Sequence, residues 1–360
     1  MPIGKPANSP FLLSVESLLA MEITIHGMSH EGDGVGRTPE GQVVFVEGGL
    51  PGDTVRVELT SKKKKVQFGR VAELLVPSAD RVVSRCGIDR CGGCALKSLS
   101  MDAQAQVKRD RVASVLRRIA KVDFPEDFEF VKPESAWHYR HRVRMHAHWS
   151  GESWRIGFYA RKSNDLVPHA GCPVLWPELD KFITRVVPFI HRLPRKVGLL
   201  EVEAVWSRAS KRGALRLIID GDMGFFRSST DWMDEAGVLG LEVAKDDTIN
   251  RFGNCELVYD QLVGDYSLSF ETGTFTQANP RMNDQLIRRV VAATEPMKGP
   301  KVMEMHAGIG NFSMPLAVMG ASVCAFEINS KSSIQSERNA SRVPISIENT
   351  CIRDADAVER

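Results

Sequence analysis

Residues 22–75 alternate apolar and polar side chains in short runs, separated by turns rich in glycine or proline. The runs cover 22–26, 43–46, 54–59 and 71–76. A period of two over four to eight residues is typical of half-buried strands. Four or five such strands with these turns predict a small β-barrel, an architecture that often binds nucleic acid without proving that function.

A helical pattern follows at 101–120, where apolar residues recur among lysines and arginines. Five further alternating runs then predict a central α+β domain dominated by antiparallel strands. These runs lie at 142–148, 155–159, 201–206, 215–219 and 266–270. A second helix is expected at 282–294, and its buried side is predicted to carry Leu286, Ile287, Val290 and Val291.

From residue 300 strands and helices alternate. A strand at 302–305 leads into a glycine-rich turn and a helix that ends at Met319. A strand at 322–328, a polar helix at 331–341 and a third strand at 345–347 are expected to follow. Such alternation predicts a parallel sheet covered by helices. The predicted fold class is therefore a multidomain combination of α/β and α+β.

The distribution of charge adds a constraint on partners. The 360 residues carry a net charge of +2, but residues 61–121 hold fifteen Lys and Arg against five Asp and Glu. A segment with a net charge of +10 favours a polyanion such as RNA, although a single lysine run is more often a solvated surface. No run of about eighteen apolar residues is present, which argues against a membrane-spanning helix.

Three of the seven cysteines are clustered, at Cys86, Cys91 and Cys94. The glycines before Cys94 allow the backbone to wrap closely around an inorganic group. A fourth ligand must come from elsewhere, and Cys172, in a loop-like context, is the best candidate. Four thiolates suit a 4Fe–4S cluster or a structural zinc ion, and the spacing leaves both open. The odd number of cysteines favours a reducing compartment, and we expect a cytoplasmic location.

A glycine-rich turn, Gly308-Ile309-Gly310, follows the strand at 302–305, and Glu327 ends the next strand. Such a turn lets a ligand approach the backbone, and a carboxylate at the end of the second strand can hold ribose hydroxyls. Ser313 stands where a dinucleotide-binding fingerprint has its third glycine, which favours S-adenosylmethionine over NAD. The alternative is an ordinary strand–helix turn, since a G-x-G pair alone is weakly specific.

Together these segments resemble the RNA uracil-C5-methyltransferase family, which uses S-adenosylmethionine to form 5-methyluridine in ribosomal or transfer RNA. Residues 32–53 are similar to its TRAM domain, an OB-like RNA-binding barrel, and 275–279 to its Phe-x-Gln-x-Asn signature. The resemblance implies a 4Fe–4S cluster, rather than zinc, on Cys86, Cys91, Cys94 and Cys172. It also implies cofactor contacts by Gln277, His306, Gly308, Asn311, Glu327 and Asp354.

The resemblance also divides the chain. From about Met21 onward it implies a TRAM barrel at 21–80, an iron–sulfur segment with the central α+β domain at 81–270, and an incomplete Rossmann-like methyltransferase domain at 271–360. Residues 1–20 are expected to be a leader before the first domain, because their apolar run is too short to span a membrane and contains Glu16. Ala307 stands where the family usually has cysteine. Two family motifs, Asp-Pro-Pro-Arg and the Ser-Cys-Asn-Pro motif that carries the nucleophile, do not occur in the 360 residues. We therefore assign no catalytic residue and expect no methyl transfer by this chain alone.

Three hypotheses follow. The chain is a family member that lacks the last part of the catalytic domain, a non-catalytic iron–sulfur RNA-binding protein, or, least favoured, a nucleotide-dependent oxidoreductase. In the first case the strand at 302–305 has an unpaired apolar edge, and cofactor binding is weak. RNA, with no obligate protein partner, is expected to contact residues 62–65, Arg109, Arg117 and Arg118. Candidates for contact with an extruded base are Tyr139, Arg140 and Arg142.

Overall fold

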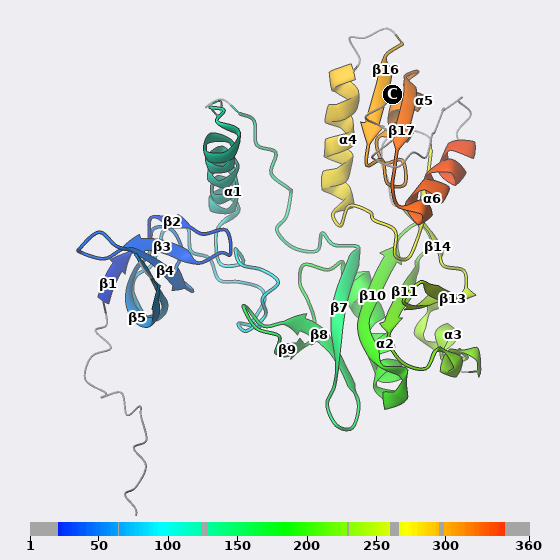
Figure 1. The fold of residues 1–360 in the computed structure, drawn as a ribbon, viewed down its shortest axis with the longest axis horizontal. Helices are drawn as coiled ribbons and strands as arrows, with labels where there is room; N and C mark the ends of the chain where they lie inside the picture. The colour runs from blue at the N-terminus through cyan, green and yellow to red at the C-terminus, as the bar shows by residue number, and fades with distance from the viewer. Residues whose placement is uncertain are drawn as a thin grey trace, which may run out of the picture. The chain divides into compact units, whose positions relative to one another are not determined.

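The computed structural model describes residues 21–63, 65–123, 125, 128–228, 230–259, 266–294 and 299–342. The chain forms two compact units, one made of residues 1–87 and 94–132 and the other of 88–93 and 133–360 (Figure 1). The predicted leader, the predicted strand at 345–347 and Asp354 lie outside the described residues. Within the described ranges, no helix is long and apolar enough to cross a membrane.

The first unit contains a six-stranded sheet with the order β1-β5-β6-β4-β3-β2. β1 also lies against β3, so the sheet curls into the predicted barrel (Figure 1). Alternate side chains such as Ile23, Val44 and Val55 are buried inside it, which is the expected result of a period-two pattern. Its strands are β1 (Met21–Thr24), β2 (Gly27–Met28), β3 (Gly34–Arg37), β4 (Val43–Glu47), β5 (Thr54–Lys63) and β6 (Val66–Val76).

A long helix, α1 (Met101–Val115), completes the first unit and continues as a π-helical turn, Leu116–Ala120. The Ser100 hydroxyl caps its N-terminus by accepting a hydrogen bond from the Ala103 amide. This confirms the helix predicted at 101–120. None of the residues of α1 or of the π-helical turn is buried. The apolar side chains of this helix therefore contribute little to the core of their unit.

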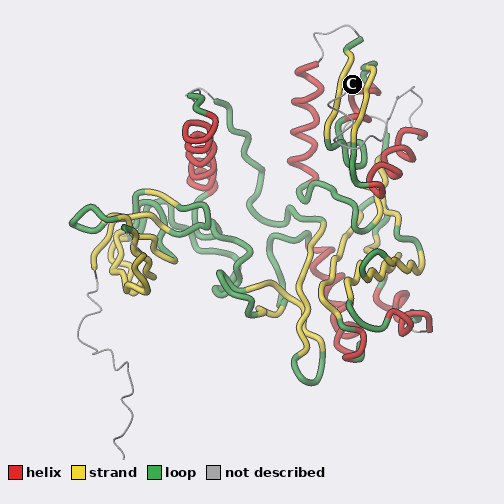
Figure 2. The backbone as a smooth tube through the Cα atoms, viewed as in Figure 1, coloured by secondary structure: helices red, strands yellow, loops and turns green. Residues whose placement is uncertain are grey.

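The second unit is built on a seven-stranded sheet with the order β13-β12-β11-β10-β7-β8-β9. All neighbours are antiparallel except β11 and β12, as expected for the central domain. Figure 2 shows these strands in yellow. Their bounds are β7 (Arg142–Trp149), β8 (Trp154–Tyr159), β9 (Leu166–Pro168), β10 (Leu199–Ser207), β11 (Arg212–Ile219), β12 (Val238–Lys245) and β13 (Thr248–Gly253). Helix α2 (Pro177–Arg192) packs against β8 and β10, and α3 (Trp232–Ala236) against β12.

The C-terminal part of the second unit starts from a hairpin, β14 (Glu256–Tyr259) and β15 (Leu268–Glu271). Helix α4 (Pro280–Thr294) follows, and then two parallel strands, β16 (Lys301–Met305) and β17 (Ser322–Phe326). Helices α5 (Ser313–Val318) and α6 (Ser330–Ser341) complete the predicted alternation (Figure 1). Among the described residues β16 pairs only with β17, and Met303 and Met305 on it are exposed.

One hydrophobic core joins the central sheet to the C-terminal part. It contains side chains of β10, β11, β14 and β15, together with Ile309 from the glycine-rich turn and Met314 from α5. A second core forms where Ile287 and Val291 of α4 meet α5 and β17. The prediction that Leu286 is buried is wrong. Its side chain is 43% exposed, because the neighbouring pair Ile287 and Val291, four residues apart on α4, faces the core instead.

Candidate functional site

Four of the predicted cofactor residues meet at one small pocket of the second unit. The cavity has a volume of about 70 Å³ and lies between residues 275–277 and the turn that follows β16. A fifth predicted residue, Glu327, is hydrogen-bonded to that turn. The sequence prediction thus names residues that share one place in the fold. The four predicted residues among those that line the pocket are Gln277, His306, Gly308 and Asn311.

The turn after β16 is shaped by three residues in the left-handed region, His306 (φ 58°), Gly308 (φ 60°) and Gly310 (φ 90°). Glu327 ties this turn to the end of β17, because its carboxylate accepts the Gly308 amide at 2.8 Å and the Asn329 amide at 2.7 Å. Each carboxylate oxygen has two lone pairs and can accept more than one hydrogen bond. The predicted contact of Glu327 with ribose hydroxyls stays a prediction.

Asn311 is fixed by a reciprocal amide pair with Asn283 of α4. Asn283 Nδ2 donates to Asn311 Oδ1 at 2.7 Å, and Asn311 Nδ2 donates to Asn283 Oδ1 at 2.9 Å. Asn283 is buried, so the pair anchors the glycine-rich turn to α4. A single pairing leaves one N–H and one lone pair of Asn311 for a ligand in the pocket.

Glu304 of β16 also lines the pocket and was not singled out from the sequence. Its carboxyl group accepts a hydrogen bond from the Ser313 hydroxyl. Burial raises the pKa of Glu304 to about 7, and the hydrogen bonds from Ser313 offset only part of this effect. The available signal was an acidic residue between two methionines of the strand predicted at 302–305.

The candidates for contact with an extruded base have different environments. Arg140 is exposed and Tyr139 is half-buried. The guanidinium of Arg142 instead binds within the protein: it pairs with Glu203 at 2.5 Å and donates to the Thr274 carbonyl and the Thr276 hydroxyl, each at 2.8 Å. Arg142 therefore holds the segment that leads to Gln277, a role that differs from the one predicted.

The four predicted cluster ligands are all partly buried. Cys86 and Cys94 belong to the first unit, and Cys91 and Cys172 to the second. Among the described residues, no group of three or more His, Cys, Asp and Glu is arranged to hold a metal ion. Four partly buried thiols still match the donor chemistry of an iron–sulfur cluster. The ligand set therefore stays a prediction.

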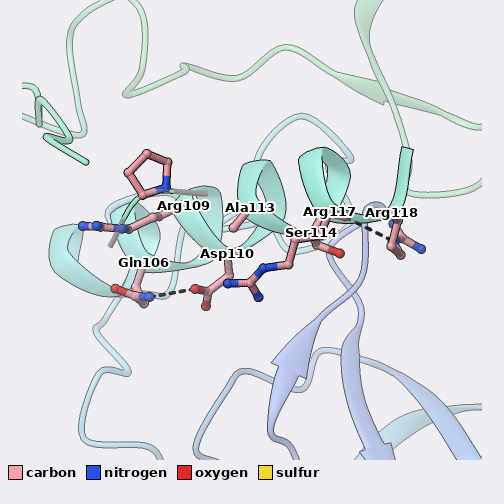
Figure 3. A pocket seen from close by; sticks show the side chains of 8 residues that line it. Gln106, Arg109, Asp110, Ala113, Ser114, Arg117 and Arg118 are labelled. Carbon is pink, nitrogen blue, oxygen red and sulfur yellow. Dashed lines mark hydrogen bonds between the residues drawn. The ribbon is translucent and has the colours of Figure 1, made fainter. Parts of the chain in front are cut away.

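The described cationic residues predicted to bind RNA lie on α1, on the π-helical turn that continues it, and where β5 meets β6. Figure 3 shows Arg109, Arg117 and Arg118 along an open hollow of about 620 Å³ on the helix surface. Asp110, in the same hollow, is engaged by Gln106 at 2.7 Å. Both Arg117 and Arg118 are exposed, and Lys62, Lys63 and Lys65 are exposed where β5 meets β6. Within this first unit, cationic side chains are therefore accessible at two places.

Comparison with known proteins connects these features. A family model described as TRAM domain matches residues 20–72, and one described as tRNA (Uracil-5-)-methyltransferase matches residues 257–352. The chain is 33% identical over 331 residues to the 23S rRNA (uracil(1939)-C(5))-methyltransferase RlmD of Methylococcus capsulatus, an alignment that covers 88% of this chain and 72% of that protein. The chain belongs to the RNA uracil-C5-methyltransferase family. The match to the TRAM model confirms the identity predicted for the barrel.

Other members of this RNA uracil-C5-methyltransferase family also match most of the chain. The RlmD protein of Dichelobacter nodosus is 32% identical over 307 residues, which cover 85% of this chain and 70% of that protein. The tRNA (uracil-54, C5)-methyltransferase of Pyrococcus abyssi, solved in complex with S-adenosyl-L-homocysteine, superposes with a TM-score of 0.70 at 21% identity. That superposition covers 93% of this chain and 79% of the other, and it confirms the fold.

Proposed function

We propose that this chain binds S-adenosylmethionine and ribosomal RNA as the recognition part of a uridine C5-methylation system. The observation that carries the proposal is the shared pocket of Gln277, His306, Gly308 and Asn311, with Glu327 bonded to its turn. Ribosomal RNA is favoured over transfer RNA because the two relatives described above, at 33% and 32% identity, are named 23S rRNA methyltransferases.

The pocket residues have separable binding roles in this proposal. Glu327 accepts the ribose hydroxyls, and the turn at Gly308 lets the nucleoside approach the backbone. Gln277 and Asn311 offer amide groups to the polar end of the cofactor, and His306 lies beside them. Asp354 is included on the resemblance alone. When bound, S-adenosylmethionine supplies the methyl group that C5 of uracil accepts.

A 4Fe–4S cluster on Cys86, Cys91, Cys94 and Cys172 is the second cofactor in this proposal. The support is the donor set, four thiols and no other ligand type, together with membership of a family that has iron–sulfur members. When bound, such a cluster would close the loops between these cysteines and so stabilise the fold.

No residue of this chain is assigned to the chemical step. C5 of uracil becomes nucleophilic only after a thiolate adds to C6, and a base must later remove the C5 proton so that the thiolate can leave. The Ser-Cys-Asn-Pro motif that would supply the thiolate does not occur in the sequence. We therefore propose that the 360-residue polypeptide alone transfers no methyl group.

Transfer of tritiated methyl groups to unmodified 23S rRNA tests this proposal. The chain alone should give no incorporation above background. Incorporation should appear when the C-terminal segment of a relative, including its Ser-Cys-Asn-Pro motif, is fused after residue 360, and not when the cysteine of that segment is alanine. Incorporation by the chain alone would refute the assignment of the missing nucleophile.

The absent nucleophile motif also favours a second candidate, a non-catalytic iron–sulfur protein that binds RNA. It predicts that the fused segment does not restore methylation, while tight and salt-dependent RNA binding remains. The same pair of fused proteins therefore separates the two functions.

A further inference from the structure

The segment that leads into the pocket, residues 272–278, has few apolar anchors of its own. Its buried side chains are threonines, Thr272, Thr274 and Thr276, and Phe275 is 68% exposed. Threonine side chains bury little apolar area, so hydrophobic burial alone does not fix the path of this segment. The hydrogen bonds made to its backbone must do so.

Two side chains from other elements donate to one carbonyl oxygen of this segment, that of Gln277. His141 Nε2 lies 3.0 Å from the oxygen, and the Tyr259 hydroxyl lies 3.1 Å from it. The backbone amide of His141 also donates to the next carbonyl, that of Ala278, at 3.2 Å. His141 therefore binds two consecutive carbonyl groups, one with its side chain and the next with its backbone amide.

The protonation state of His141 follows from these contacts. The Gln277 carbonyl can only accept, so we assign the ring proton to Nε2; the backbone of Trp206 is a second hydrogen-bond partner of the ring. The side chain is 1% exposed. Burial and the neighbouring Arg142 charge lower the pKa of His141 to about 3, so the ring is neutral at ordinary pH. In the assigned tautomer the neutral ring donates to the Gln277 carbonyl.

The ring of His141 has little freedom to move away from this position. Its centroid lies 5.3 Å from that of Tyr259 and 5.7 Å from that of Trp176, and Phe270 is a third aromatic neighbour at 6.1 Å. Donors are therefore held rigidly against an oxygen whose own residue, Gln277, lines the pocket. A small displacement of that carbonyl would move the Gln277 side chain with it.

We infer that His141 is a positioning residue, which sets the place of Gln277 in the pocket by holding the Gln277 and Ala278 carbonyls. The inference rests on the proposed role of Gln277 in cofactor binding. The Nε2–H bond is the feature that matters, so a side chain with a donor at the same distance from the backbone can replace histidine.

Hydrogen exchange measured by mass spectrometry on the full chain, without cofactor, tests the inference. His141→Phe keeps a ring but removes the donor, and it should accelerate exchange in peptides covering 273–279 roughly five- to tenfold. His141→Gln, whose amide nitrogen can take the place of Nε2, should stay within about twofold of the wild type. His191→Phe, the same change at a half-buried histidine of α2, is the matched control and should leave these peptides unchanged.

Tyr259→Phe removes only the second donor and should also accelerate the same peptides about fivefold. If His141→Phe accelerates exchange throughout the second unit, Tyr259→Phe tests the hydrogen bond to the Gln277 carbonyl instead. The inference is overturned if His141→Phe and His141→Gln exchange equally fast, since ring packing would then be the cause, or if neither His141→Phe nor Tyr259→Phe changes the segment.

Binding of S-adenosylhomocysteine, read by saturation-transfer difference NMR, separates this inference from the proposed function. If the inference holds, His141→Phe should reduce the ligand signal several-fold and His141→Gln should restore it. If exchange is accelerated in His141→Phe but the wild type gives no ligand signal, the proposed function is contradicted. The positioning of the Gln277 carbonyl by His141 would still be supported.

Discussion

Replacing Glu304 with glutamine should remove a pH-dependent loss of stability. Glu304 lies in the pocket beneath the glycine-rich turn, and burial raises its pKa from 4.5 to about 7. Between these two values the folded protein keeps the proton that the unfolded chain has released. The contribution of this group to stability is therefore complete below pH 4.5, falls as the pH rises, and is lost above pH 7.

The size of the effect follows from the shift. One pKa unit corresponds to about 1.4 kcal/mol, so raising the pKa of Glu304 from 4.5 to about 7 corresponds to at most about 3–4 kcal/mol. Glutamine does not titrate and keeps an oxygen that can accept the hydrogen bond from Ser313. The free energy of unfolding of Glu304→Gln relative to the wild type should therefore rise by 1–3 kcal/mol, roughly, from pH 5 to pH 8.

Urea denaturation followed by tryptophan fluorescence measures this difference, because all six tryptophans belong to the second unit. The difference between variant and wild type at each pH cancels the titration of other groups. Glu337→Gln, an exposed position on α6, is the control and should not change the pH profile. Parallel profiles for Glu304→Gln and the wild type would refute the argument that Glu304 is protonated at neutral pH.

Three further changes test other parts of the structure. Glu242→Gln should lower the free energy of unfolding by about 3–5 kcal/mol in the same assay, because this fully buried carboxylate lies 2.9 Å from Arg216, 3.2 Å from Arg251 and 2.6 Å from Lys331. Cys172→Ala should lose most of the iron of anaerobically purified protein, whereas Cys255→Ala should keep it; zinc without iron in the wild type would contradict the cluster. Arg117→Gln and Arg118→Gln should each lower the slope of log affinity for RNA against log salt by about one, and an unchanged slope would show that the face in Figure 3 does not contact phosphates.

The sequence predicted best those elements that have one buried face. Strands β1, β4, β5 and β7 alternate regularly, so their positions followed from the period of two. β2 and β3 were not predicted as strands, because they are only two and four residues long and rich in glycine. β12 was missed because six of its eight residues are buried and both of its faces are covered, which removes the alternation. Helix α2 was missed although its apolar residues recur at helical spacing, because Pro188 inside it resembles a helix end.

The candidate site could be predicted where a motif determines a local conformation, and not where it depends on tertiary contacts. The turn at Gly308 and the carboxylate at Glu327 are local to two adjacent strands, and their meeting followed from the strand–helix–strand pattern. His141 is separated by 136 residues from the carbonyl that it holds. His141 lies just before β7 and continues the alternation of the buried residues Val143 and Met145. This pattern predicts that its side chain is buried, but it does not show which group the side chain contacts.

The most direct measurement of the central claim is binding of S-adenosylhomocysteine to the wild type and to Glu327→Gln, by saturation-transfer difference NMR with NAD as competitor. We expect weak binding to the wild type with a signal on the ribose protons, because the carboxylate accepts the hydroxyls and one edge of β16 is unpaired among the described residues. Glu327→Gln should lose that signal, and NAD should not reduce it. Equal signals from the two proteins, or displacement by NAD, would contradict the claim that this pocket is an S-adenosylmethionine site.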